Sequence, residues 1–286
     1  MGKLLDLIRL ARPYQWYKNL VIFIAVFFSG NLFNLDLIAL TTLGFISLCL
    51  VSSANYAIND IVDRNSDSKH PEKKKRPIAS GRVGIATAIA EAALLLASGF
   101  MLAYLLSPRF FICAIALFIL TMLYSMHMKN EPFADIMFIG TNFVLRALGG
   151  VFILNAGISP WLVICAFFAA IFLAVSKRKA DLFIMGAKAA EHKKVLKYYP
   201  KSLLNSMINI SATLLIISFS LYSFMKPHNS LLALLPFFLF IIFRYIYLVN
   251  SGSIIGRHPH LVYKDLRLVI AGAISGIIIF VVFYVF

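Results

Sequence analysis

Carboxylate and carboxamide side chains repeat along residues 55–67 at the spacing of one helical face. Asn55, Asn59, Asp63 and Asp67 are four residues apart, and Asp60 lies three residues before Asp63. Residues three and four apart are neighbours on an α-helix, and carboxylates so close repel one another unless a cation lies among them. Hard oxygen ligands that leave open positions suit Mg²⁺. The spacing therefore predicts a magnesium site, with a solvated acidic helix end as the alternative.

A basic run follows these acids directly in the sequence. Its members are Lys69, Lys73, Lys74, Lys75 and Arg76. Lysine and arginine are suited to binding phosphate oxygens. Pro77 and Gly81 predict a turn that could fold the run back over the acidic face. The run therefore predicts a phosphate site, with topology and attraction to lipid headgroups as the alternative role.

Polar side chains also occur inside apolar segments, where a charge is costly. Asp135, Asn142 and Arg146 are seven and four residues apart, which places them on one stripe of a helix. An arginine in such a segment faces a cavity or a partner, so Arg146 either reaches an anionic substrate group or pairs with another helix. Lys177 and Arg178 end a further apolar segment. The dipole of a helix C-terminus favours cations there on its own, so their position leaves their role open.

The composition indicates which elements must position these residues. Of the 286 residues, 61% are hydrophobic and 14% are charged, and the mean hydropathy is +0.87. A soluble domain is about half apolar and about a quarter charged. Soluble globular and disordered classes are thereby excluded, and an all-α, polytopic membrane bundle is predicted. Nine apolar segments fit this class, at residues 17–35, 37–57, 84–106, 109–128, 133–154, 158–176, 203–225, 228–249 and 268–286.

The basic residues orient these segments. With a cytoplasmic N-terminus, 23 of the 27 Lys and Arg residues lie on the cytoplasmic side and two lie outside, as the positive-inside rule requires. This distribution accounts for most of the net charge of +15 without a nucleic-acid partner. We therefore expect one integral domain, 1–286, in the cell (inner or cytoplasmic) membrane. Its active site is expected to face the cytoplasm, on the long loops 58–83 and 177–202.

Three strings of residues carry a family resemblance. N-D-x-x-D-x-x-x-D at Asn59–Asp67 resembles the first aspartate-rich motif of the UbiA superfamily of intramembrane prenyltransferases. R-P-x-Q-W-x-K-N at Arg12–Asn19 and H-P-x-K-x-x-R-P-I-A-S-G at His70–Gly81 resemble its decaprenyl-phosphate phosphoribosyltransferase branch. The similarity continues at Tyr124-Ser125, Lys129, Asp135, Phe143–Ala147 and Lys177–Arg178.

Typical UbiA aromatic prenyltransferases carry a second motif, DxxxD, between the fourth and fifth spans. Glu131 and Asp135 have that spacing here. Pro132 is predicted to start the helix, because proline is favoured at the first helical position, and this leaves Glu131 outside it. Asp135 is therefore the candidate for a metal ligand in this segment.

The resemblance implies a UbiA-like bundle of about nine transmembrane helices that moves 5-phosphoribose from 5-phosphoribosyl 1-diphosphate to a polyprenyl phosphate in the lipid bilayer. It implies Mg²⁺ as the cofactor, held by Asn59, Asp60, Asp63, Asp67 and Asp135. The catalytic residues would be Asp60, Asp63, Lys73 and Arg76. Substrate contacts would come from Lys18, Asn55, Lys73, Arg76, Tyr124, Lys129, Arg146, Lys177 and Arg178. The oligomeric state stays open.

Two other functions fit a polar face on a membrane bundle. A conventional prenyltransferase would move an isoprenyl group from its diphosphate to an aromatic or glycerol-phosphate acceptor, and it would share the fold and the first motif. The string at His70–Gly81 and the incomplete DxxxD count against it. An organic-anion transporter is the second alternative. Transporters often have broken helices at the middle of the membrane, whereas the polar residues here gather at one face.

Overall fold

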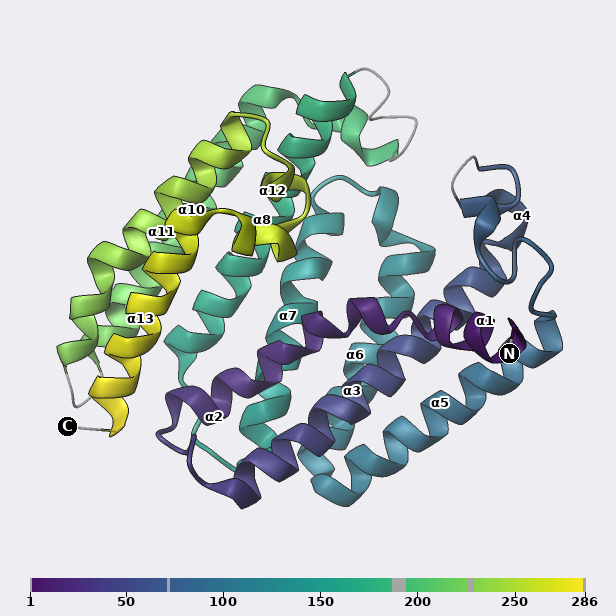
Figure 1. Ribbon diagram of the computed structural model, residues 1–286, viewed down its shortest axis with the longest axis horizontal. Coiled ribbons are helices and arrows are strands. Elements are labelled where there is room, and N and C mark those ends of the chain that lie inside the picture. The colour runs from purple at the N-terminus through teal and green to yellow at the C-terminus, as the bar shows by residue number, and fades with distance from the viewer. Residues whose placement is uncertain (1, 71–72, 187–193, 226–228, 285–286) are drawn as a thin grey trace. The chain divides into compact units, whose positions relative to one another are not determined.

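The computed structural model consists of helices over the residues that it describes, 2–70, 73–186, 194–225 and 229–284, and no strand occurs among them (Figure 1). The predicted all-α class is confirmed. Pro71 of the His70–Gly81 string and residues 187–193 of the second long loop lie outside the described residues. The elements are α1 (Gly2–Ala11), η1 (Pro13–Phe23), α2 (Ile24–Phe28), α3 (Leu35–Val62), α4 (Arg64–Asp67), η2 (Lys73–Lys75), α5 (Ile85–Leu106), α6 (Pro108–Met126), η3 (Met128–Asn130), α7 (Ala134–Ile153), α8 (Pro160–Met185), η5 (Lys194–Tyr198), α10 (Lys201–Phe224), η6 (Asn229–Leu234), α11 (Leu235–Asn250), α12 (Ile254–Arg257), η7 (Pro259–Lys264) and α13 (Leu266–Tyr284).

Eight helices in the described part of the chain are long and apolar enough to cross a membrane. They are α3, α5, α6, α7, α8, α10, the stretch Ser230–Asn250 that contains α11, and α13. Their mean hydropathies over a membrane-length window lie between 1.7 and 2.5. These eight match the second to ninth predicted segments, so the chain is a multi-pass membrane protein.

The first predicted segment, 17–35, differs from the other eight. Residues Pro13–Phe23 form a 3₁₀-helix, η1, and only Ile24–Phe28 continue it as the α-helix α2. A 3₁₀-helix rises about 2.0 Å per residue and an α-helix about 1.5 Å. The two pieces together therefore extend roughly 30 Å, which is about the thickness of the hydrocarbon core. Residues 13–28, which share only 17–28 with the predicted segment, therefore have the length of a span without being one long α-helix.

The chain divides into two compact units. Unit 1 comprises Met1–His127 and Leu145–Gly157, and unit 2 comprises Met128–Val144 and Ile158–Phe286. Helix α7 contributes its first part to unit 2 and its last part to unit 1. The single domain 1–286 stays a prediction.

Close helix packing holds unit 1 together. Helices α3 and α5 lie side by side (Figure 1), and Ser47 Oγ of α3 donates to the carbonyl oxygen of Gly99 in α5 at 2.8 Å. A Cβ atom at Gly99 would lie 2.9 Å from a methyl carbon of Val51. Small residues let membrane helices approach in this way. The pairing fixes the position of the α3 end that carries the acidic motif.

Helix α3 ends inside the acidic motif. Asn34 caps its beginning by accepting a hydrogen bond from the Leu37 N–H at 3.2 Å. Its last residue is Val62, and Asp63 takes a non-helical conformation with φ −82° and ψ 0° before the short helix α4 begins at Arg64. The acidic motif therefore spans the end of one helix, a turn and a second short helix.

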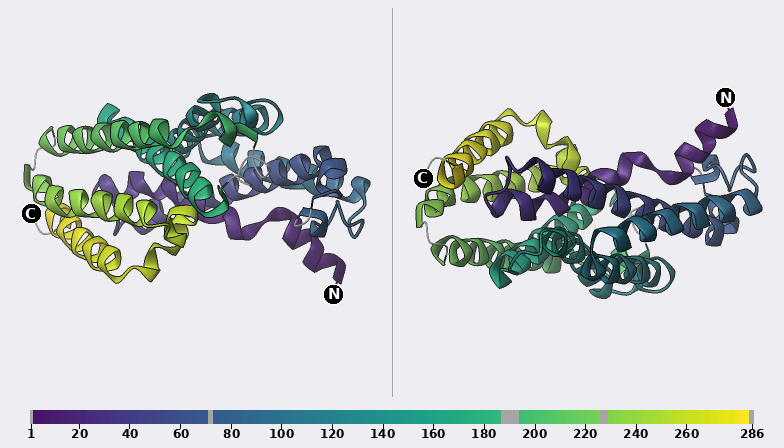
Figure 2. Two further views of the ribbon diagram at one scale, coloured as in Figure 1. Left: turned by 90° about the horizontal axis from the view of Figure 1, so that it is seen from above. Right: turned by 90° about the horizontal axis from the view of Figure 1, so that it is seen from below.

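Unit 2 is built around α8 and α10, which pack along their length. Helices α10, α11 and α13, drawn green to yellow, run alongside one another (Figure 2). Asp265 joins α11 to α13: its Oδ2 lies 2.7 Å from Arg244 Nη2, and its Oδ1 accepts the Leu268 N–H at 3.0 Å. The hydrogen bond from Arg244 holds the pKa of the Asp265 carboxyl below its usual value.

The substitution Gly150→Ala in α7 tests how closely η1 packs against α7 in unit 1. A Cβ atom there would collide with the Ile22 carbonyl oxygen and would lie 3.0 Å from Ala25 Cβ. Gly150→Ala should therefore lower the thermal unfolding temperature in detergent, because overpacking costs about 1–3 kcal/mol. Gly272→Ala in α13 is the matched control, since a Cβ there meets no atom within 4 Å. Equal unfolding temperatures for the two variants would contradict the η1–α7 contact.

Candidate active site

Two acids of the motif are buried and face arginines. Asp60 and Asp67 are each 2% exposed. Arg76 Nη1 lies 3.0 Å from Asp60 Oδ1 and 2.6 Å from Asp67 Oδ2, so one guanidinium bridges both carboxylates. Arg12 Nη2 contacts Asp60 Oδ1 at 2.5 Å, and Lys73 Nζ lies 3.7 Å from Asp67 Oδ1. The structure thus brings together four of the predicted catalytic and metal-binding residues, and adds Arg12.

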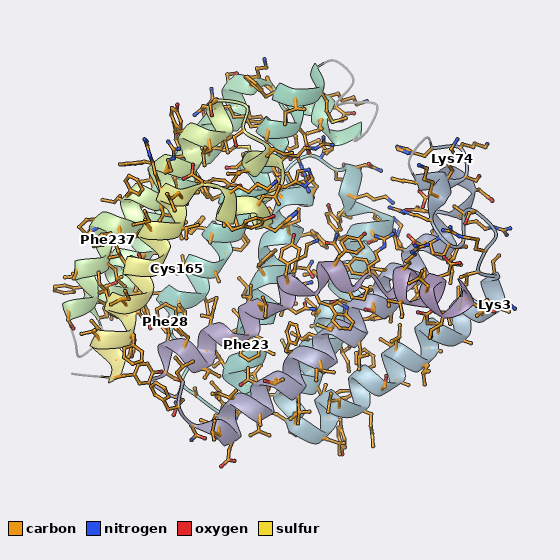
Figure 3. The ribbon with its side chains drawn as sticks, viewed as in Figure 1. Lys3, Phe23, Phe28, Lys74, Cys165 and Phe237 are labelled. Atoms are coloured by element: carbon orange, nitrogen blue, oxygen red, sulfur yellow. The ribbon has the colours of Figure 1, made fainter. Side chains whose placement is uncertain are left out.

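A tight turn follows the basic run, as the sequence predicts, and Arg76 at the end of the run lies beside the acids. Gly81 has φ +76°, a left-handed conformation that favours glycine. The Val83 N–H donates to the Pro77 carbonyl oxygen at 3.0 Å, and Ser80 Oγ donates to that of Arg76 at 2.8 Å. Arg76 is thereby held beside the acids, whereas Lys74 is exposed and extends from η2 (Figure 3).

The oxygens of the motif fit a hard divalent cation. Asp60 Oδ2 and Asn55 Oδ1 are buried and accept no hydrogen bond within the described part of the chain. Asp63 and Asn59 are half-buried, and Asn59 Nδ2 donates to Asp63 Oδ2 at 3.3 Å. No three Asp, Glu, His or Cys side chains among the described residues already converge as a ligand set. Mg²⁺ commonly takes only one or two carboxylates and completes its shell with water and substrate phosphates, so this donor set suits it.

Arg146 is buried in unit 1 and held by an amide. It is 7% exposed, and its Nε donates to Asn19 Oδ1 at 2.8 Å. Asn19 is 1% exposed, and its Nδ2 donates to Cys49 Sγ at 3.3 Å. The oxygen and the nitrogen of the Asn19 amide therefore each have a hydrogen-bond partner, which fixes the orientation of the amide. The amide in turn fixes the direction of the guanidinium.

The Arg12–Asn19 string lies along α3. Trp16 Nε1 donates to Ser53 Oγ at 3.0 Å, and that hydroxyl donates to the Ala11 carbonyl oxygen at 2.7 Å. Arg12 is the N-cap residue before η1 and has φ +52°, and its guanidinium lies over the Tyr56 ring at 5.1 Å from the ring centre. The contacts place Arg12 at Asp60 and Asn19 at Arg146. Lys18, on the same string, is half-buried.

The predicted residues of unit 2 form a second polar cluster. Asp135 is 0% exposed and Arg178 is 4% exposed. Arg178 donates to Asp135 Oδ2 from Nη2 at 3.0 Å and from Nε at 3.2 Å. The Tyr199 hydroxyl donates to Asp135 Oδ1 at 2.7 Å and accepts the Phe133 N–H at 2.6 Å. Burial, and then the bond to the carboxylate, raise the pKa of Tyr199, so the phenol keeps its proton.

The remaining predicted contacts lie outside these two clusters. Tyr124 in α6 and Lys129 in η3 are half-buried, and Lys177 in the last part of α8 is exposed. Close to Lys177, Arg257 Nε lies 3.0 Å from Asp181 Oδ1. Burial, and then the positive charges of Lys177 and Arg257, lower the pKa of His258. This part of α8 therefore carries several cations and one acid.

Sequence reasoning assigned no role to three of these residues. Arg12 and Asn19 lie within the quoted Arg12–Asn19 string, so the string itself was a signal for them. Tyr199 lies in the stretch K-V-L-K-Y-Y-P, and nothing in that stretch points to Asp135.

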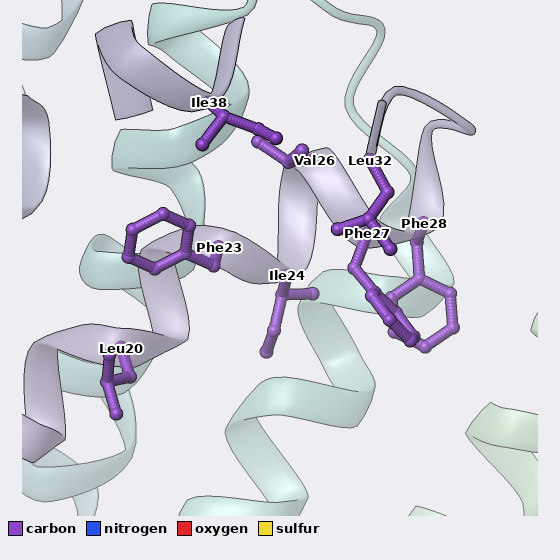
Figure 4. Close-up of a pocket in the computed structure, with 8 residues that line it drawn as sticks. All are labelled: Leu20, Phe23, Ile24, Val26, Phe27, Phe28, Leu32 and Ile38. Carbon is purple, nitrogen blue, oxygen red and sulfur yellow. The ribbon is translucent and has the colours of Figure 1, made fainter. Parts of the chain in front are cut away.

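An apolar cavity of about 290 Å³ lies in unit 1 (Figure 4). It is lined by Leu20, Phe23, Ile24, Val26, Phe27, Phe28, Leu32 and Ile38. Ile38 is 22 residues before Asp60 on α3, which corresponds to roughly 33 Å along the helix. The cavity is therefore at the opposite end of α3 from the acidic motif.

The chain resembles curated and solved proteins over most of its length. Residues 19–253 match the model of the UbiA prenyltransferase family. The decaprenyl-phosphate phosphoribosyltransferase of Mycolicibacterium smegmatis is 30% identical over 233 residues, which cover 80% of this chain and 73% of that protein. The enzyme of the same name from Mycobacterium tuberculosis is 25% identical over 253 residues, 86% of this chain and 83% of the relative.

Solved structures share the fold at lower identity. A UbiA homolog from Archaeoglobus fulgidus bound to GPP and Mg²⁺ has a TM-score of 0.73 and 21% identity, with 96% of each chain covered. A digeranylgeranylglyceryl phosphate synthase structure has a TM-score of 0.70 and 18% identity, with 100% of each chain covered. Together with the match over residues 19–253, these findings show that the chain belongs to the UbiA prenyltransferase family.

Proposed function

We propose that the protein is a membrane phosphoribosyltransferase that moves 5-phosphoribose from 5-phosphoribosyl 1-diphosphate to a polyprenyl phosphate, with release of diphosphate and with Mg²⁺ as cofactor. The observation that carries the proposal is the similarity to decaprenyl-phosphate phosphoribosyltransferases across 78–86% of the chain. The pairing of Arg76 with Asp60 and Asp67 supports it, because acids and cations meet there at the motif shared with the family.

The reaction makes a demand that this set of side chains can meet. An oxygen of the lipid phosphate forms a bond to ribose C1 while the bond from C1 to the diphosphate oxygen breaks, and the diphosphate leaves with the electron pair. The acceptor phosphate is already largely ionised near neutral pH, because a second phosphate pKa is about 6. No general base is needed. The main task is electrostatic stabilisation of the leaving diphosphate.

Each predicted group has a place in that task. Asn59, Asp60, Asp63 and Asp67 would hold the divalent cation, which when bound supplies positive charge to the diphosphate. Lys73 and Arg76 neutralise Asp67 and Asp60, and they would also donate to phosphate oxygens of the soluble donor. Asn55 would orient the donor through its amide. The acidic motif would thus have two kinds of counter-charge, the divalent cation and the side chains of Lys73 and Arg76.

The predicted contacts to phosphate and ribose extend beyond the motif. Arg146, Lys177 and Arg178 would contact the lipid phosphate or the ribose-linked phosphate, and Lys18, Tyr124 and Lys129 would complete the substrate contacts. Arg146 is the best supported of these, because Asn19 orients its guanidinium within an apolar helix. The polyprenyl chain would lie along the apolar helices. The cavity lined by Phe23 and Phe27 would suit the distant part of a long chain.

We also propose that the protein lies in the inner cell membrane with its active site facing the cytoplasm. The distribution of Lys and Arg supports this orientation, and a soluble, highly charged sugar diphosphate would then reach the site without crossing the bilayer. A conventional prenyltransferase is the second candidate, because solved UbiA homologs with the same fold bind GPP or DMAPP with Mg²⁺. Family membership favours either transferase over an organic-anion transporter.

A two-donor assay separates these candidates. Purified protein should transfer label from phosphoribosyl diphosphate into the lipid phase when polyprenyl phosphate and Mg²⁺ are present. It should transfer no prenyl group from geranyl diphosphate to aromatic or glycerol-phosphate acceptors, because the string at His70–Gly81 is typical of the phosphoribosyltransferase branch. Prenyl transfer without phosphoribosyl transfer would decide for the conventional prenyltransferase. Flux of the donor into proteoliposomes without covalent product would decide for transport.

Asp63→Asn tests the metal site. The change keeps the size of the side chain and removes its charge, so we expect phosphoribosyl transfer at fixed Mg²⁺ to fall by roughly 100-fold, the usual effect of losing one stabilising group. The Mg²⁺ concentration for half-maximal activity should rise. Asp36→Asn is the matched control, because Asp36 is an exposed acid at the other end of α3. Near-normal activity of Asp63→Asn would remove Asp63 from the site.

Arg146→Gln tests the buried cation. A hydrogen bond to a charged group contributes about 1.5–3 kcal/mol, so we expect kcat/KM for the polyprenyl phosphate to fall roughly 10- to 100-fold. Arg109→Gln is the control, since Arg109 is exposed at the start of α6, where it donates to Asn155. If the Arg146→Gln variant lost stability but kept its kcat/KM, Arg146 would be a structural arginine.

A further inference from the structure

Asp135 is a poor candidate for a metal ligand in this chain, because the protein already uses both of its carboxylate oxygens. Oδ2 accepts two hydrogen bonds from Arg178, and Oδ1 accepts one from the Tyr199 hydroxyl. The side chain is wholly buried, at 0% exposure. A divalent cation would have to displace the guanidinium and leave it buried without a counter-charge, which is strongly unfavourable. The contrast with Asp60, whose Oδ2 accepts no hydrogen bond within the described residues, is direct.

The partners of Asp135 reach the turn that precedes α7. Phe133 has φ +64°, an uncommon conformation for a residue with a Cβ atom. Its N–H lies at the N-terminus of α7, where backbone donors have no partner within the helix. The Tyr199 hydroxyl accepts this N–H at 2.6 Å, and the two rings pack edge to face with centroids 5.8 Å apart. Tyr199 therefore holds a strained turn in place.

The same turn carries Lys129. The 3₁₀-helix η3, Met128–Asn130, contacts η5, the segment that leads to Tyr199. The Glu131 N–H donates to the Met128 carbonyl oxygen at 3.1 Å, and the Asp135 N–H donates to that of Glu131 at 3.1 Å. Hydrogen bonds thus run in two directions from Asp135: its side chain connects Arg178 with Tyr199 and, through Tyr199, with the Phe133 N–H, and its backbone N–H connects through Glu131 to Met128, the residue before Lys129.

We propose that Asp135, Arg178 and Tyr199 form a positioning cluster that holds the Lys129 turn for substrate binding, and that Asp135 acts in this way and not as a metal ligand. The cluster is defined by its four hydrogen bonds within unit 2. The role of Lys129 toward phosphate rests on the proposed function. Two parts of the proposal do not rest on the proposed function: that the cluster holds the turn in place, and that Asp135 is not a metal ligand.

The first test measures the turn itself and needs no activity. Trypsin cleaves after lysine, and cleavage between Lys129 and Asn130 can be followed by mass spectrometry. Tyr199→Phe removes the hydroxyl with its two hydrogen bonds and leaves the ring, so cleavage should accelerate at least about fivefold, the rise in the open population for one lost hydrogen bond. Tyr198→Phe is the matched control, because Tyr198 is 50% exposed and its ring lies under Lys197. Equal cleavage rates in both variants would overturn the proposal.

The second test separates positioning from metal binding. We would measure Mn²⁺ binding in the presence of diphosphate by electron paramagnetic resonance. The Mn²⁺ affinity should be unchanged in Asp135→Asn. It should fall at least about tenfold in Asp63→Asn, since losing a group that supports a metal site usually lowers the metal affinity by about 10- to 100-fold. Equal weakening in the two variants would make Asp135 a ligand and overturn the proposal. If even the wild type bound no Mn²⁺, the proposed cofactor would fail while the trypsin result still decided the hold on the turn.

The third test connects the cluster to Lys129. Tyr199→Phe should raise the KM for phosphoribosyl diphosphate about fivefold with little change in kcat, since a hydrogen bond that only positions contributes this much. In a Lys129→Ala background the same change should have no further effect on KM, because the group being positioned is gone. Additive effects in the double variant would contradict positioning through Lys129. A wild type without phosphoribosyl transfer would refute the proposed function and leave the first two tests valid.

Discussion

The burial of carboxylates in an apolar protein is the constraint on which the rest of the structure depends. An isolated buried charge is very costly, and it persists only when a counter-charge and hydrogen bonds accompany it. Arginine suits this role because its planar group donates in a fixed fork and stays charged. The five buried aspartates of the described residues each contact an arginine: Asp6 meets Arg9 and Arg82, Asp60 meets Arg12 and Arg76, Asp67 meets Arg76, Asp135 meets Arg178, and Asp265 meets Arg244. Twelve acids against 27 bases leave cations to spare for substrate.

These pairs also determine how local sequence becomes a site. Arg76 can bridge Asp60 and Asp67 because α3 stops at Val62 and the chain turns between the acids and the basic run, where the His70 N–H donates to the Asp67 carbonyl oxygen at 3.1 Å. Had α3 continued without interruption, the acids would simply line its surface. The break therefore converts a helical repeat of acids into a cluster in which Asp60 and Asp67 share one guanidinium. One cation of this cluster, Arg76, comes from the same loop, whereas the other partner of Asp60, Arg12, comes from 48 positions earlier in the chain.

Sequence patterns predicted what depends on local spacing and missed what depends on distant partners. Hydropathy predicted eight of the long helices, and the four-residue repeat predicted the acidic cluster at Asp60 and Asp67. The segment 17–35 differs because hydropathy counts apolar residues and cannot distinguish a 3₁₀-helix from an α-helix. Tyr199 was missed because it is 64 positions from Asp135, and only the fold brings them together. The role of Arg146 likewise depends on Asn19, 127 positions away.

The two acidic segments illustrate why spacing alone cannot assign a metal ligand. Asp60 and Asp135 are both buried aspartates beside a helix end, and both are paired with arginine. They differ in the second oxygen: that of Asp60 accepts no hydrogen bond among the described residues, whereas that of Asp135 is bound to a tyrosine hydroxyl. A carboxylate can bind a cation at one oxygen while an arginine holds the other. When both oxygens accept hydrogen bonds, as in Asp135, a cation has to compete with those donors. The chemistry of each acid therefore follows from the partner of its second oxygen, which the sequence does not encode locally.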